Sequence, residues 1–474
     1  MDKIKLNKKK VGFVRYKKFG DEYFITNEIG RYFFLKPNDF NKFIEGKLDK
    51  KDKLYKELQK KFFIKDDLNS EDLIDIYQQR NAFLFHGTSL HIVVATLRCN
   101  YNCIYCQASS RNLKAKGFDM SKKTAQAVVE TIFQSPNPNI TIEFQGGEPL
   151  VNWPTIKFIV EAAEKKNKKA KKKLFISLVT NLSLMDSEKY DYIVKHHISV
   201  CTSLDGPEKL HNLNRPFVNG NSYQATTSWI KKFKEKEKKD RSLYRLSALV
   251  TISKFSYKYP KEIVDEYLKW GFRGIHLRPL SFLGLSNKFK DSIDQSVKEF
   301  LEFWRKSMDY IIDINLKGRF FWERGSAIML KKILGDIDPN FLDLRSPCGA
   351  GIGQMLYNYD GKVYTCDEAR MLGEDIFVLG NVLKNNYKQL ISHPNLRAVC
   401  QASILENSPC DYCAYKPYCG VCPVSNYALY GDLFAPNANN YRCQLSIGML
   451  DYLFKKLQND KIKTIFKKWL GIKK

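Results

Sequence analysis

The sequence lacks the features that place a protein in a membrane or outside the cell. It contains no run of about 18 apolar residues, the length needed to span a bilayer. The first residues, from Met1 to Lys8, are charged and lack the apolar core of a secretory signal. We therefore expect a cytoplasmic protein with no membrane span. Thiols stay reduced in that compartment, so the twelve cysteines are expected to bind metal rather than to form disulfides.

Acidic residues are too few to balance the basic ones. The chain has 51 acidic residues against 78 Lys and Arg, a net charge of +27, which raises the question of a nucleic-acid partner. Lysine is spread along the chain, however, and its densest run, Lys165 to Lys173, lies at a predicted helix end, where cations are favourable. No aromatic residues alternate with lysine there, as they do in single-strand binding grooves. We expect a solvated basic surface and no nucleic acid.

A chain of 474 residues, 44% of them hydrophobic, is too long for one ordinary core. Composition and pattern divide it into a small α+β module (1–88), an α/β domain (89–310), a connector (311–345), a cysteine-rich domain (346–450) and an amphipathic helix (451–474). For the last segment two interpretations stay open. Its apolar stripe packs on the protein body, or it attaches to a membrane surface.

The N-terminal module combines strands with helices. Three short apolar-aromatic runs, Phe13–Tyr16, Tyr23–Thr26 and Tyr32–Leu35, are separated by glycine-containing turns, and helical patterns follow, including one at Leu73 to Tyr77. This order resembles the winged-helix leader-binding elements found beside peptide-modifying enzymes, which bind a peptide as an added strand on the sheet edge. A purely structural N-terminal cap is the alternative.

Strand and helix patterns alternate between residues 89 and 310. The helix after the first strand is well marked, because Ser121 is a suitable N-cap and apolar residues from Ala125 to Phe133 follow the helical period. The alternation predicts a parallel sheet with right-handed crossovers and chemistry at the carboxyl ends of its strands. The six predicted strands are Leu90–Thr96, Ile140–Phe144, Leu174–Val179, Ile198–Ser203, Leu246–Ile252 and Gly274–Arg278.

Three cysteines, Cys99, Cys103 and Cys106, follow the first predicted strand in a C-x3-C-x2-C pattern. Three thiolates on one tight loop can hold three corners of a cubane iron–sulfur cluster and leave its fourth iron open to another ligand. Structural zinc sites close all four positions, commonly with paired C-x2-C motifs, so the triplet does not fit them. The pattern resembles the radical SAM superfamily, in which the open iron binds S-adenosylmethionine.

The second predicted strand ends in Gln145-Gly146-Gly147-Glu148-Pro149, which matches the GGEP motif of that superfamily. The two glycines let the backbone approach a ligand closely, and Glu148 can accept a hydrogen bond from a cationic α-amino group. The resemblance implies a partial (β/α)6 barrel, a [4Fe-4S] cluster on the cysteine triplet, and reductive cleavage of S-adenosylmethionine to a 5′-deoxyadenosyl radical.

Polar residues follow further strands. By the same resemblance, the cofactor-binding set extends to Asn181, Ser203, Asp205 and Arg215. Ser203 and Asp205 are expected near the methionine or ribose part of the cofactor. Arg215 has two interpretations, a carboxylate ligand or a surface salt bridge, and Arg278 shares this ambiguity. Cys201, inside a strand and without partner spacing, is predicted to be a small core residue.

Beyond residue 346 the cysteines return with spacings that resemble the SPASM extension of radical SAM peptide maturases, which carries two auxiliary [4Fe-4S] clusters. By that family's interleaved ligation, a nearer cluster is held by Cys348, Cys366 and Cys422, and an outer cluster by Cys410, Cys413, Cys419 and Cys443. The chain departs from the family in the spacing x2, rather than x3, between Cys419 and Cys422. Cys400 either completes the nearer cluster or leaves it an open iron. A zinc ribbon built from the two C-x2-C pairs is the alternative.

Asp367 directly follows Cys366. In the related sulfatase maturases a carboxylate at this place acts as the catalytic base, which suits a substrate radical that must lose a proton and an electron. Glu368 is a second candidate. The alternative is that Asp367 caps a turn or pairs with Arg370.

The resemblance implies an enzyme that oxidatively modifies a ribosomally made peptide and receives electrons from a flavodoxin or ferredoxin. The runs Thr365–Arg370 and Pro417–Pro423, together with the N-terminal module, look most like the His-Xaa-Ser system radical SAM maturases. One alternative keeps the chemistry and changes the substrate, giving a sulfatase-type maturase that forms formylglycine. Another is a non-catalytic, zinc-bound nucleic-acid or scaffold protein that uses the basic surface.

Overall fold

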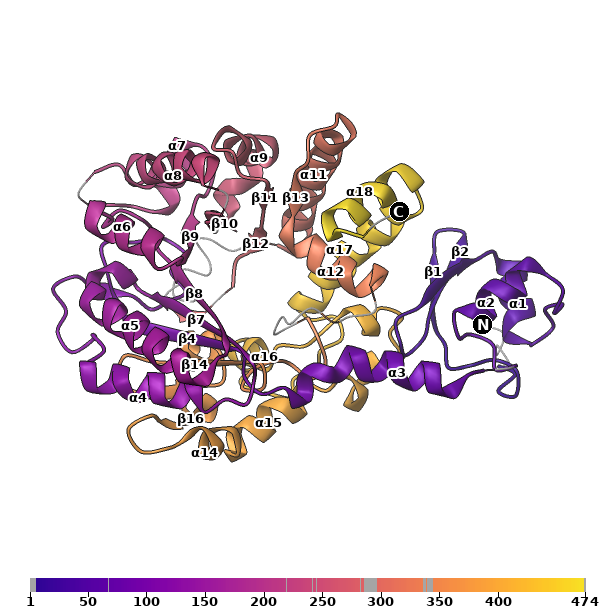
Figure 1. Ribbon diagram of the computed structural model, residues 1–474. Coiled ribbons are helices and arrows are strands. Elements are labelled where there is room, and N and C mark those ends of the chain that lie inside the picture. The colour runs from indigo at the N-terminus through magenta and orange to yellow at the C-terminus, as the bar shows by residue number, and fades with distance from the viewer. Residues whose placement is uncertain are drawn as a thin grey trace.

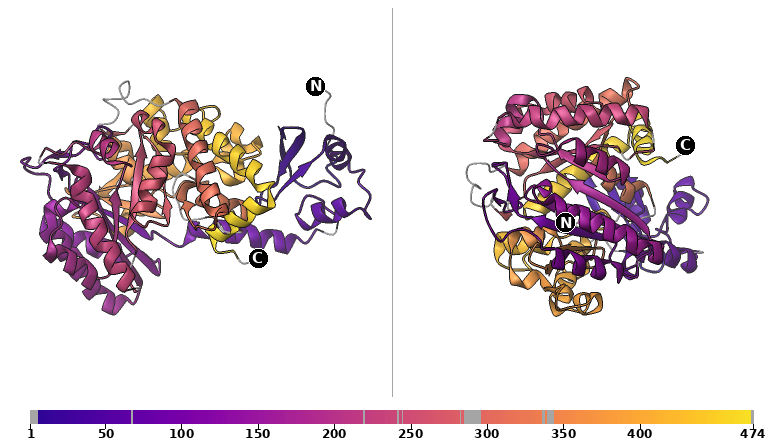
Figure 2. Two further views of the ribbon diagram at one scale, coloured as in Figure 1. Left: turned by 90° about the horizontal axis from the view of Figure 1, so that it is seen from above. Right: turned by 60° about the vertical axis from the view of Figure 1, so that its left-hand side comes forward.

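The computed structural model describes residues 6–472, except 67, 219, 241, 244, 282, 285–295, 336–337 and 339–343. A curved nine-stranded sheet, in the order β12-β10-β9-β8-β7-β4-β14-β15-β16, forms the centre. Helices cover its outer side, and the N-terminal module lies at one end of the molecule beside the C-terminal helices (Figures 1 and 2).

The six predicted strands form one parallel array within this sheet. They are β4 (Leu90–Thr96), β7 (Asn139–Gly146), β8 (Lys173–Val179), β9 (Ser199–Ser203), β10 (Ser247–Ile252) and β12 (Leu277–Pro279). The last prediction is corrected in one respect. Residues 274–278 do not form one strand, because β11 (Gly274–Ile275) pairs with β13 (Trp322–Glu323) while β12 pairs with β10.

Helices alternate with these strands as the sequence predicts. They are α4 (Lys122–Phe133), α5 (Trp153–Ala170), α6 (Ser187–Lys195), α7 (Glu208–Asn214), α8 (Ser222–Lys239) and α9 (Pro260–Lys269). The predicted N-cap is confirmed, since the Ser121 hydroxyl accepts a hydrogen bond from the Thr124 N–H at 3.1 Å. Helix α4 buries the predicted face, which includes Ala125, Val128 and Ile132.

The cysteine-rich segment shares the central sheet. Strand β14 (Gln354–Tyr357) pairs in parallel with β4, and β15 (Lys362–Tyr364) and β16 (Val378–Asn381) continue antiparallel. The sequence analysis does not predict these strands. The remaining short elements are β5 (Arg98–Cys99), β6 (Arg111–Asn112), α13 (Asp367–Leu372), α14 (Tyr387–Ile391), α15 (Pro394–Ala402) and α16 (Pro423–Tyr430).

The predicted boundaries at residues 310 and 451 fall inside helices. Helix α11 (Val297–Leu316) crosses the first and α17 (Tyr441–Leu457) crosses the second. Both helices pack with α18 (Asp460–Leu470), and α12 (Arg324–Leu334) packs with α17 and α18. The apolar stripe of the last segment is buried against this group, and the Trp469 indole donates to the Asn315 Oδ1 at 3.3 Å. Packing on the protein body is therefore the correct interpretation. Within the described part of the chain, no helix has the length and apolar composition to cross a bilayer.

The N-terminal module contains an antiparallel sheet, β1 (Arg15–Phe19), β2 (Glu22–Thr26) and β3 (Tyr32–Leu35), and two helices, α1 (Pro37–Ile44) and α2 (Lys53–Lys60). Its own core includes Ile25, Phe40 and Leu58. Helix α3 (Ser70–Asn81) then leads to the main body (Figure 1). The helical pattern at Leu73 to Tyr77 does form this helix, yet Ile74 and Tyr77 stay exposed rather than packing on a core.

The seam between β4 and β14 contains a buried histidine. The His91 ring accepts from the Tyr357 hydroxyl at 3.0 Å through Nδ1 and donates to the Thr88 carbonyl at 3.2 Å through Nε2. Burial lowers the pKa of His91 from its usual 6.5 to about 3. The neutral ring is therefore the form that the seam holds.

This shift predicts a pH dependence of stability. Because the unfolded chain binds a proton at His91 below about pH 6.5 and the folded chain does not, the contribution of His91 is complete above pH 6.5 and falls toward pH 3. Both proteins are compared without metal. Between pH 7 and pH 5 the His91→Asn variant should lose about 2 kcal/mol less unfolding free energy than the wild-type protein loses. Urea unfolding at both pH values measures this. His86→Asn, at an exposed position, is the control, and an unchanged pH dependence in His91→Asn would contradict the prediction.

Candidate functional site

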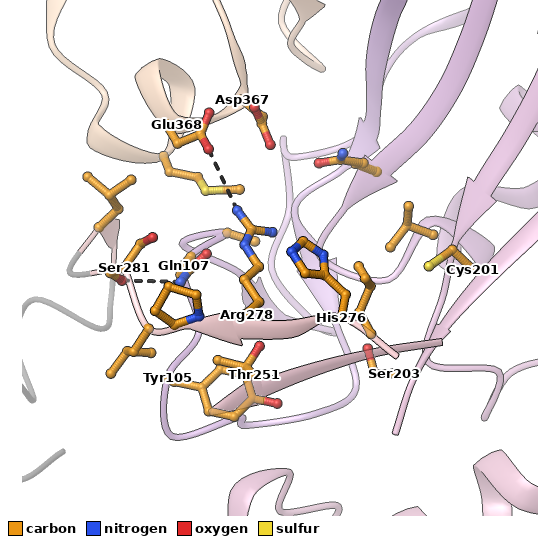
Figure 3. A pocket seen from close by; sticks show the side chains of 18 of the residues that line it. Tyr105, Gln107, Cys201, Ser203, Thr251, His276, Arg278, Ser281, Asp367 and Glu368 are labelled. Atoms are coloured by element: carbon orange, nitrogen blue, oxygen red, sulfur yellow. Dashed lines mark hydrogen bonds and ion pairs between the residues drawn. The ribbon is translucent and has the colours of Figure 1, made fainter. Parts of the chain in front are cut away.

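A cavity of about 750 Å³ opens at the carboxyl ends of the parallel strands. Its lining joins the ends of β7 to β12 with α13 and the start of α17, and Figure 3 shows part of it. The predicted cluster ligands Cys99, Cys103 and Cys106 all lie on this lining. The structure thus brings the cysteine triplet to the place where the strand-end motifs converge.

The thiol donors of the triplet suit an iron–sulfur cluster. Burial raises the pKa of the Cys99 thiol, and it raises the pKa of Cys103 to about 12. Thiolates at these positions therefore need nearby positive charge, which the irons of a cluster would provide. The Arg215 Nη1 lies 3.8 Å from the Cys103 Sγ and adds a fixed cation.

The glycines of the GGEP motif make a close approach, and their neighbour is the cysteine loop. A Cβ on Gly146, whose φ is +145°, would lie 2.1 Å from the Thr96 carbonyl oxygen, and one on Gly147 would lie 2.3 Å from the Arg98 oxygen. The Gly147 N–H donates to Thr96 O at 3.0 Å and the Glu148 N–H donates to Arg98 O at 2.8 Å. Glycine is therefore required at these two positions because they pack closely against the cysteine-loop backbone, in addition to any approach to a ligand.

Glu148 lies on the cavity wall and is held on three sides. Its carboxylate accepts from the Thr180 hydroxyl at 2.6 Å, the Asn181 N–H at 2.8 Å and the Leu150 N–H at 3.1 Å. Burial raises the pKa of Glu148 to about 6. The Asn181 side-chain amide donates to Asn100 Oδ1 at 3.0 Å, which ties the end of β8 to the cysteine loop. These contacts fix the predicted ammonium partner at the end of β7.

Asp205 and Arg215 form a buried ion pair. The Arg215 Nε donates to the Asp205 Oδ2 at 3.1 Å, and the Tyr105 hydroxyl donates to the same oxygen. The pair is therefore internal, not a surface salt bridge. Ser203 and Arg215 line the cavity. Asp205 is fully buried and is not among the described residues of the lining. Asp205 thus acts on the cavity through Arg215 and through Tyr105 of the cysteine loop.

Asp367 and Glu368 enter the cavity from the N-terminus of α13 (Figure 3). The Gln354 amide donates to Asp367 Oδ1 at 2.9 Å, and Arg278 Nη2 lies 3.6 Å from Glu368 Oε1. Burial and the neighbouring Asp367 raise the pKa of Glu368 to about 8. Burial also opposes ionisation of Asp367, but the hydrogen bond from Glu368 and the charge of Arg278 lower its pKa overall.

Arg278 and Arg370 both have partners across the cavity. Arg278 pairs with Glu368 inside the cavity and links β12, at one end of the curved sheet, to α13 near the other. Arg370 donates through Nη1 to the Ala108 carbonyl at 2.6 Å, directly beyond the cysteine triplet. Both contacts fasten the cysteine-rich segment to the α/β domain across the cavity.

Cys201 requires a correction. Its place in a strand without partner spacing predicts a core residue, but Cys201 lines the cavity next to Ser203 (Figure 3). The signal was present in the strand period, because residues two apart share one face and Ser203 was already placed there. The lining also contains His276, Arg324 and Arg442, which the sequence analysis does not identify. They come from strand and helix ends that only the folded chain brings together.

The remaining cysteines gather in two neighbouring groups. Cys348, Cys366 and Cys422 belong to one buried cluster of side chains. A second cavity of about 50 Å³ is lined by Cys410, Cys413, Cys419, Cys443 and also Cys422. Cys400 is near enough to Cys348 for its charge to raise the pKa of the Cys348 thiol further, after the larger effect of burial. Cys422 thus lies next to both groups, and the assignment of each cysteine to a cluster stays a prediction.

The spacing of these thiols argues against a single zinc ion. Zn–S bonds of about 2.3 Å place the sulfurs of one tetrahedral site roughly 4 Å apart. A single ion therefore needs three or more side chains whose metal-donor atoms lie close together. Among the described residues, the group whose donor atoms all lie within 4.8 Å of one another is Cys366, Asp367 and Glu368, which is not a set of cysteines. The two C-x2-C pairs therefore lack zinc-ribbon spacing.

Comparison with known proteins agrees with this geometry. Residues 93–275 match the family model of the Radical SAM superfamily. A cysteine-type anaerobic sulfatase-maturating enzyme of Clostridium perfringens is 27% identical over 390 residues, which cover 78% of this chain and 97% of that protein. The radical SAM cyclopropyl synthase TigE of Paramaledivibacter caminithermalis is 25% identical over 357 residues, 72% of this chain and 69% of TigE.

Two solved structures share the fold. Native anSMEcpe with bound AdoMet aligns with a TM-score of 0.67 at 21% identity and covers 80% of this chain and 100% of its own. Streptococcus suis SuiB bound to its precursor peptide SuiA aligns with a TM-score of 0.56 at 14% identity, covering 90% of this chain and 98% of its own. The likeness therefore extends well beyond the α/β domain.

The contact of the glycines with the cysteine loop can be tested. Gly147→Ala forces the Arg98 carbonyl to move, so we expect a loss of about 1–3 kcal/mol of stability from overpacking and a weakened site at the triplet. Urea unfolding of the metal-free protein measures the stability. The iron content after reconstitution measures binding at the triplet. Gly117→Ala is the control for the iron readout. Its φ of +79° strains the backbone of the variant, but no atom lies within 4 Å of the added Cβ, so its iron binding should stay at the wild-type level. Retention of wild-type iron binding by Gly147→Ala would contradict the account.

Proposed function

We propose, from the match of residues 93–275 to the Radical SAM family model, that this protein oxidatively modifies a peptide. The observation that carries the proposal is a single cavity whose wall holds Cys99, Cys103 and Cys106 together with Glu148 and Asp367. A cofactor held at the triplet and a substrate beside α13 would share that space. Cleavage of the cofactor and modification of the substrate would therefore take place in one cavity.

The chain's residues have distinct tasks in this scheme. The triplet would hold a [4Fe-4S] cluster, and Glu148, Asn181, Ser203 and Arg215 would hold the amino, carboxylate and ribose groups of S-adenosylmethionine. When bound, the cluster and cofactor would supply a 5′-deoxyadenosyl radical that abstracts a hydrogen atom. A substrate radical then becomes a closed-shell product by losing one proton and one electron. Asp367, which projects into the cavity beside Gln354, is placed to take the proton.

The electron would leave through the two further cysteine groups. We propose that Cys348, Cys366 and Cys422 hold a nearer auxiliary cluster and that Cys410, Cys413, Cys419 and Cys443 hold an outer one, as in the SPASM extension. Cys400, beside Cys348, is the candidate fourth ligand of the nearer cluster. The donor sets consist of thiols, which iron–sulfur clusters prefer. A flavodoxin or ferredoxin would be the external electron donor.

Two substrate classes compete. A peptide of His-Xaa-Ser type is favoured by the Thr365–Arg370 and Pro417–Pro423 runs and by an N-terminal module suited to peptide recognition. A sulfatase-type substrate is favoured by the match to almost the full length of an anaerobic sulfatase-maturating enzyme. SuiB bound to the peptide SuiA, and anSMEcpe bound to an 18Cys peptide, show that proteins of this fold bind peptides. The thiol spacing gives no support to the zinc-bound scaffold alternative.

A paired peptide assay separates the two classes. The reconstituted, dithionite-reduced enzyme is incubated with S-adenosylmethionine and either a His-Xaa-Ser repeat peptide or a cysteine-containing sulfatase peptide. We expect faster formation of 5′-deoxyadenosine and a hydrogen-depleted product with the first peptide, measured by mass spectrometry. Formylglycine in the second peptide alone would favour the sulfatase-type alternative. No product from either peptide would contradict both.

The role of Asp367 predicts a separation of two steps. Asp367→Asn keeps the size and the contact with Gln354 but removes the proton acceptor. It should therefore retain 5′-deoxyadenosine formation and lower peptide product by about 100-fold or more, the usual contribution of a general base. Asp375→Asn, whose side chain is exposed, is the matched control. Unchanged product yield in Asp367→Asn would exclude Asp367 as the base.

A further inference from the structure

The N-terminal sheet packs directly on the loop that carries three of the outer cysteines. This loop, Cys410 to Cys419, contacts both the sheet and α17, because the Tyr415 ring packs against Phe24 of β2 and against Phe454 of α17. The N-terminal sheet lies beside the C-terminal helices in Figures 1 and 2. From residue 409 to 419, all described, the loop's regular structure consists of the short 3-10 turns η7 (Pro409–Tyr412) and η8 (Lys416–Tyr418). Such turns are weak by themselves, so the loop depends on contacts from outside.

Charged contacts hold the first half of the loop. Arg15, with a side chain only 2% exposed, places Nη2 2.6 Å from Glu28 Oε2 and 3.0 Å from Asp411 Oδ1. Its Nε also donates to the Asp411 carbonyl. Lys416, whose side chain is 5% exposed, contacts Asp411 at 2.7 Å and Glu28 at 3.1 Å. The sheet and the loop therefore share one charged network, in which two buried cations each bridge the two partly exposed carboxylates.

Two neutral hydrogen bonds hold the rest of the loop. The Thr26 hydroxyl at the end of β2 donates to the Ala414 carbonyl at 2.8 Å. The Tyr418 hydroxyl donates to the Gly30 carbonyl at 2.9 Å, and both contacts are buried. Ala414 and Tyr418 each adjoin a cysteine of the outer group in sequence. Because these two residues are held in place, the backbone that orients the Cys413 and Cys419 side chains is held as well.

Aromatic packing completes the interface. The Phe24 ring of β2 lies 5.4 Å from Tyr415 and 4.4 Å from Phe454 of α17. Lys17 of β1 lies 4.6 Å above the Tyr415 ring and pairs with Asp451 at 2.9 Å. By contrast Tyr412, on the same loop, is 81% exposed. The loop is thus held from the side of the sheet, and the sheet shields it from water.

We propose that the N-terminal sheet is a structural part of the outer cysteine site, which binds its metal cluster only while the sheet is docked on the loop. The inference rests on the proposed function, because it takes Cys410, Cys413, Cys419 and Cys443 as ligands of an iron–sulfur cluster. It gives residues 1–88 a task besides peptide recognition. The residues at the interface act on the ligands through the loop backbone, so Arg15, Thr26 and Tyr418 are positioning residues.

Full-length variants test this without touching a cysteine. Arg15→Leu removes the cation between Glu28 and Asp411, and the double variant Thr26→Val/Tyr418→Phe removes both hydroxyl donors while keeping side-chain shape. Controls are Lys18→Ala, at an exposed position of β1, and Tyr412→Ala on the exposed part of the loop. Far-UV circular dichroism selects variants that stay folded. The milder double variant decides the question if Arg15→Leu does not fold.

The first readout uses metal-free protein and does not depend on the proposed chemistry. Alkylation by iodoacetamide, mapped by mass spectrometry, should become several-fold faster at Cys410, Cys413, Cys419 and Cys443 in the interface variants. It should not change at Cys99, Cys103 or Cys106, nor in the two controls. Wild-type alkylation rates in both interface variants would overturn the proposal.

The second readout follows anaerobic reconstitution. The interface variants should lose about four irons, the content of one cubane, and retain 5′-deoxyadenosine formation because the triplet is intact. Full iron content in both variants would also overturn the proposal. If the wild-type protein itself formed no 5′-deoxyadenosine, the proposed function would fail, and the alkylation result would still decide whether the sheet shapes the thiol site.

Discussion

The close approach of β7 to the cysteine loop is the constraint on which the candidate site depends. Gly146 and Gly147 allow the end of one strand to lie against the backbone that follows its neighbour, at distances no other residue permits. Two backbone hydrogen bonds then align Glu148 with the loop. From this junction the Glu148 carboxylate reaches Thr180 and Asn181 at the end of β8. The thiol triplet and the polar strand ends thereby become one wall of one cavity.

Two contacts connect this wall to the cysteine-rich segment, and a third connects that segment to the N-terminal sheet. Arg278 meets Glu368 across the cavity, and Arg370 holds the backbone just beyond the triplet. The N-terminal sheet, in turn, holds the loop of the outer cysteines through Arg15. Each contact joins segments separated by tens to hundreds of residues. The three cysteine groups therefore belong to one continuous structure, which suits a reaction that moves a proton and an electron away from the same substrate.

The sequence was most informative where structure is local. Strand and helix periods predicted the parallel array, and the Ser121 cap was found because its hydrogen bond spans three residues. Long-range pairings were missed: nothing in the β14 sequence shows that it pairs with β4, and Arg15 carries no sign of its partner Asp411. Cys201 was misplaced although its strand face was known, because a lone cysteine in a strand is usually a packing residue. The side chains that complete the cavity come from elements whose association no local pattern encodes.

Metal content and cofactor cleavage, measured together after anaerobic reconstitution, test the central claim most directly. The account predicts about twelve irons per chain with matching sulfide, little zinc, and 5′-deoxyadenosine from S-adenosylmethionine with dithionite. Replacing Cys99, Cys103 and Cys106 by Ala should remove about four irons and abolish the cleavage. Zinc without labile sulfide, or cleavage that survives the loss of the triplet, would contradict the account.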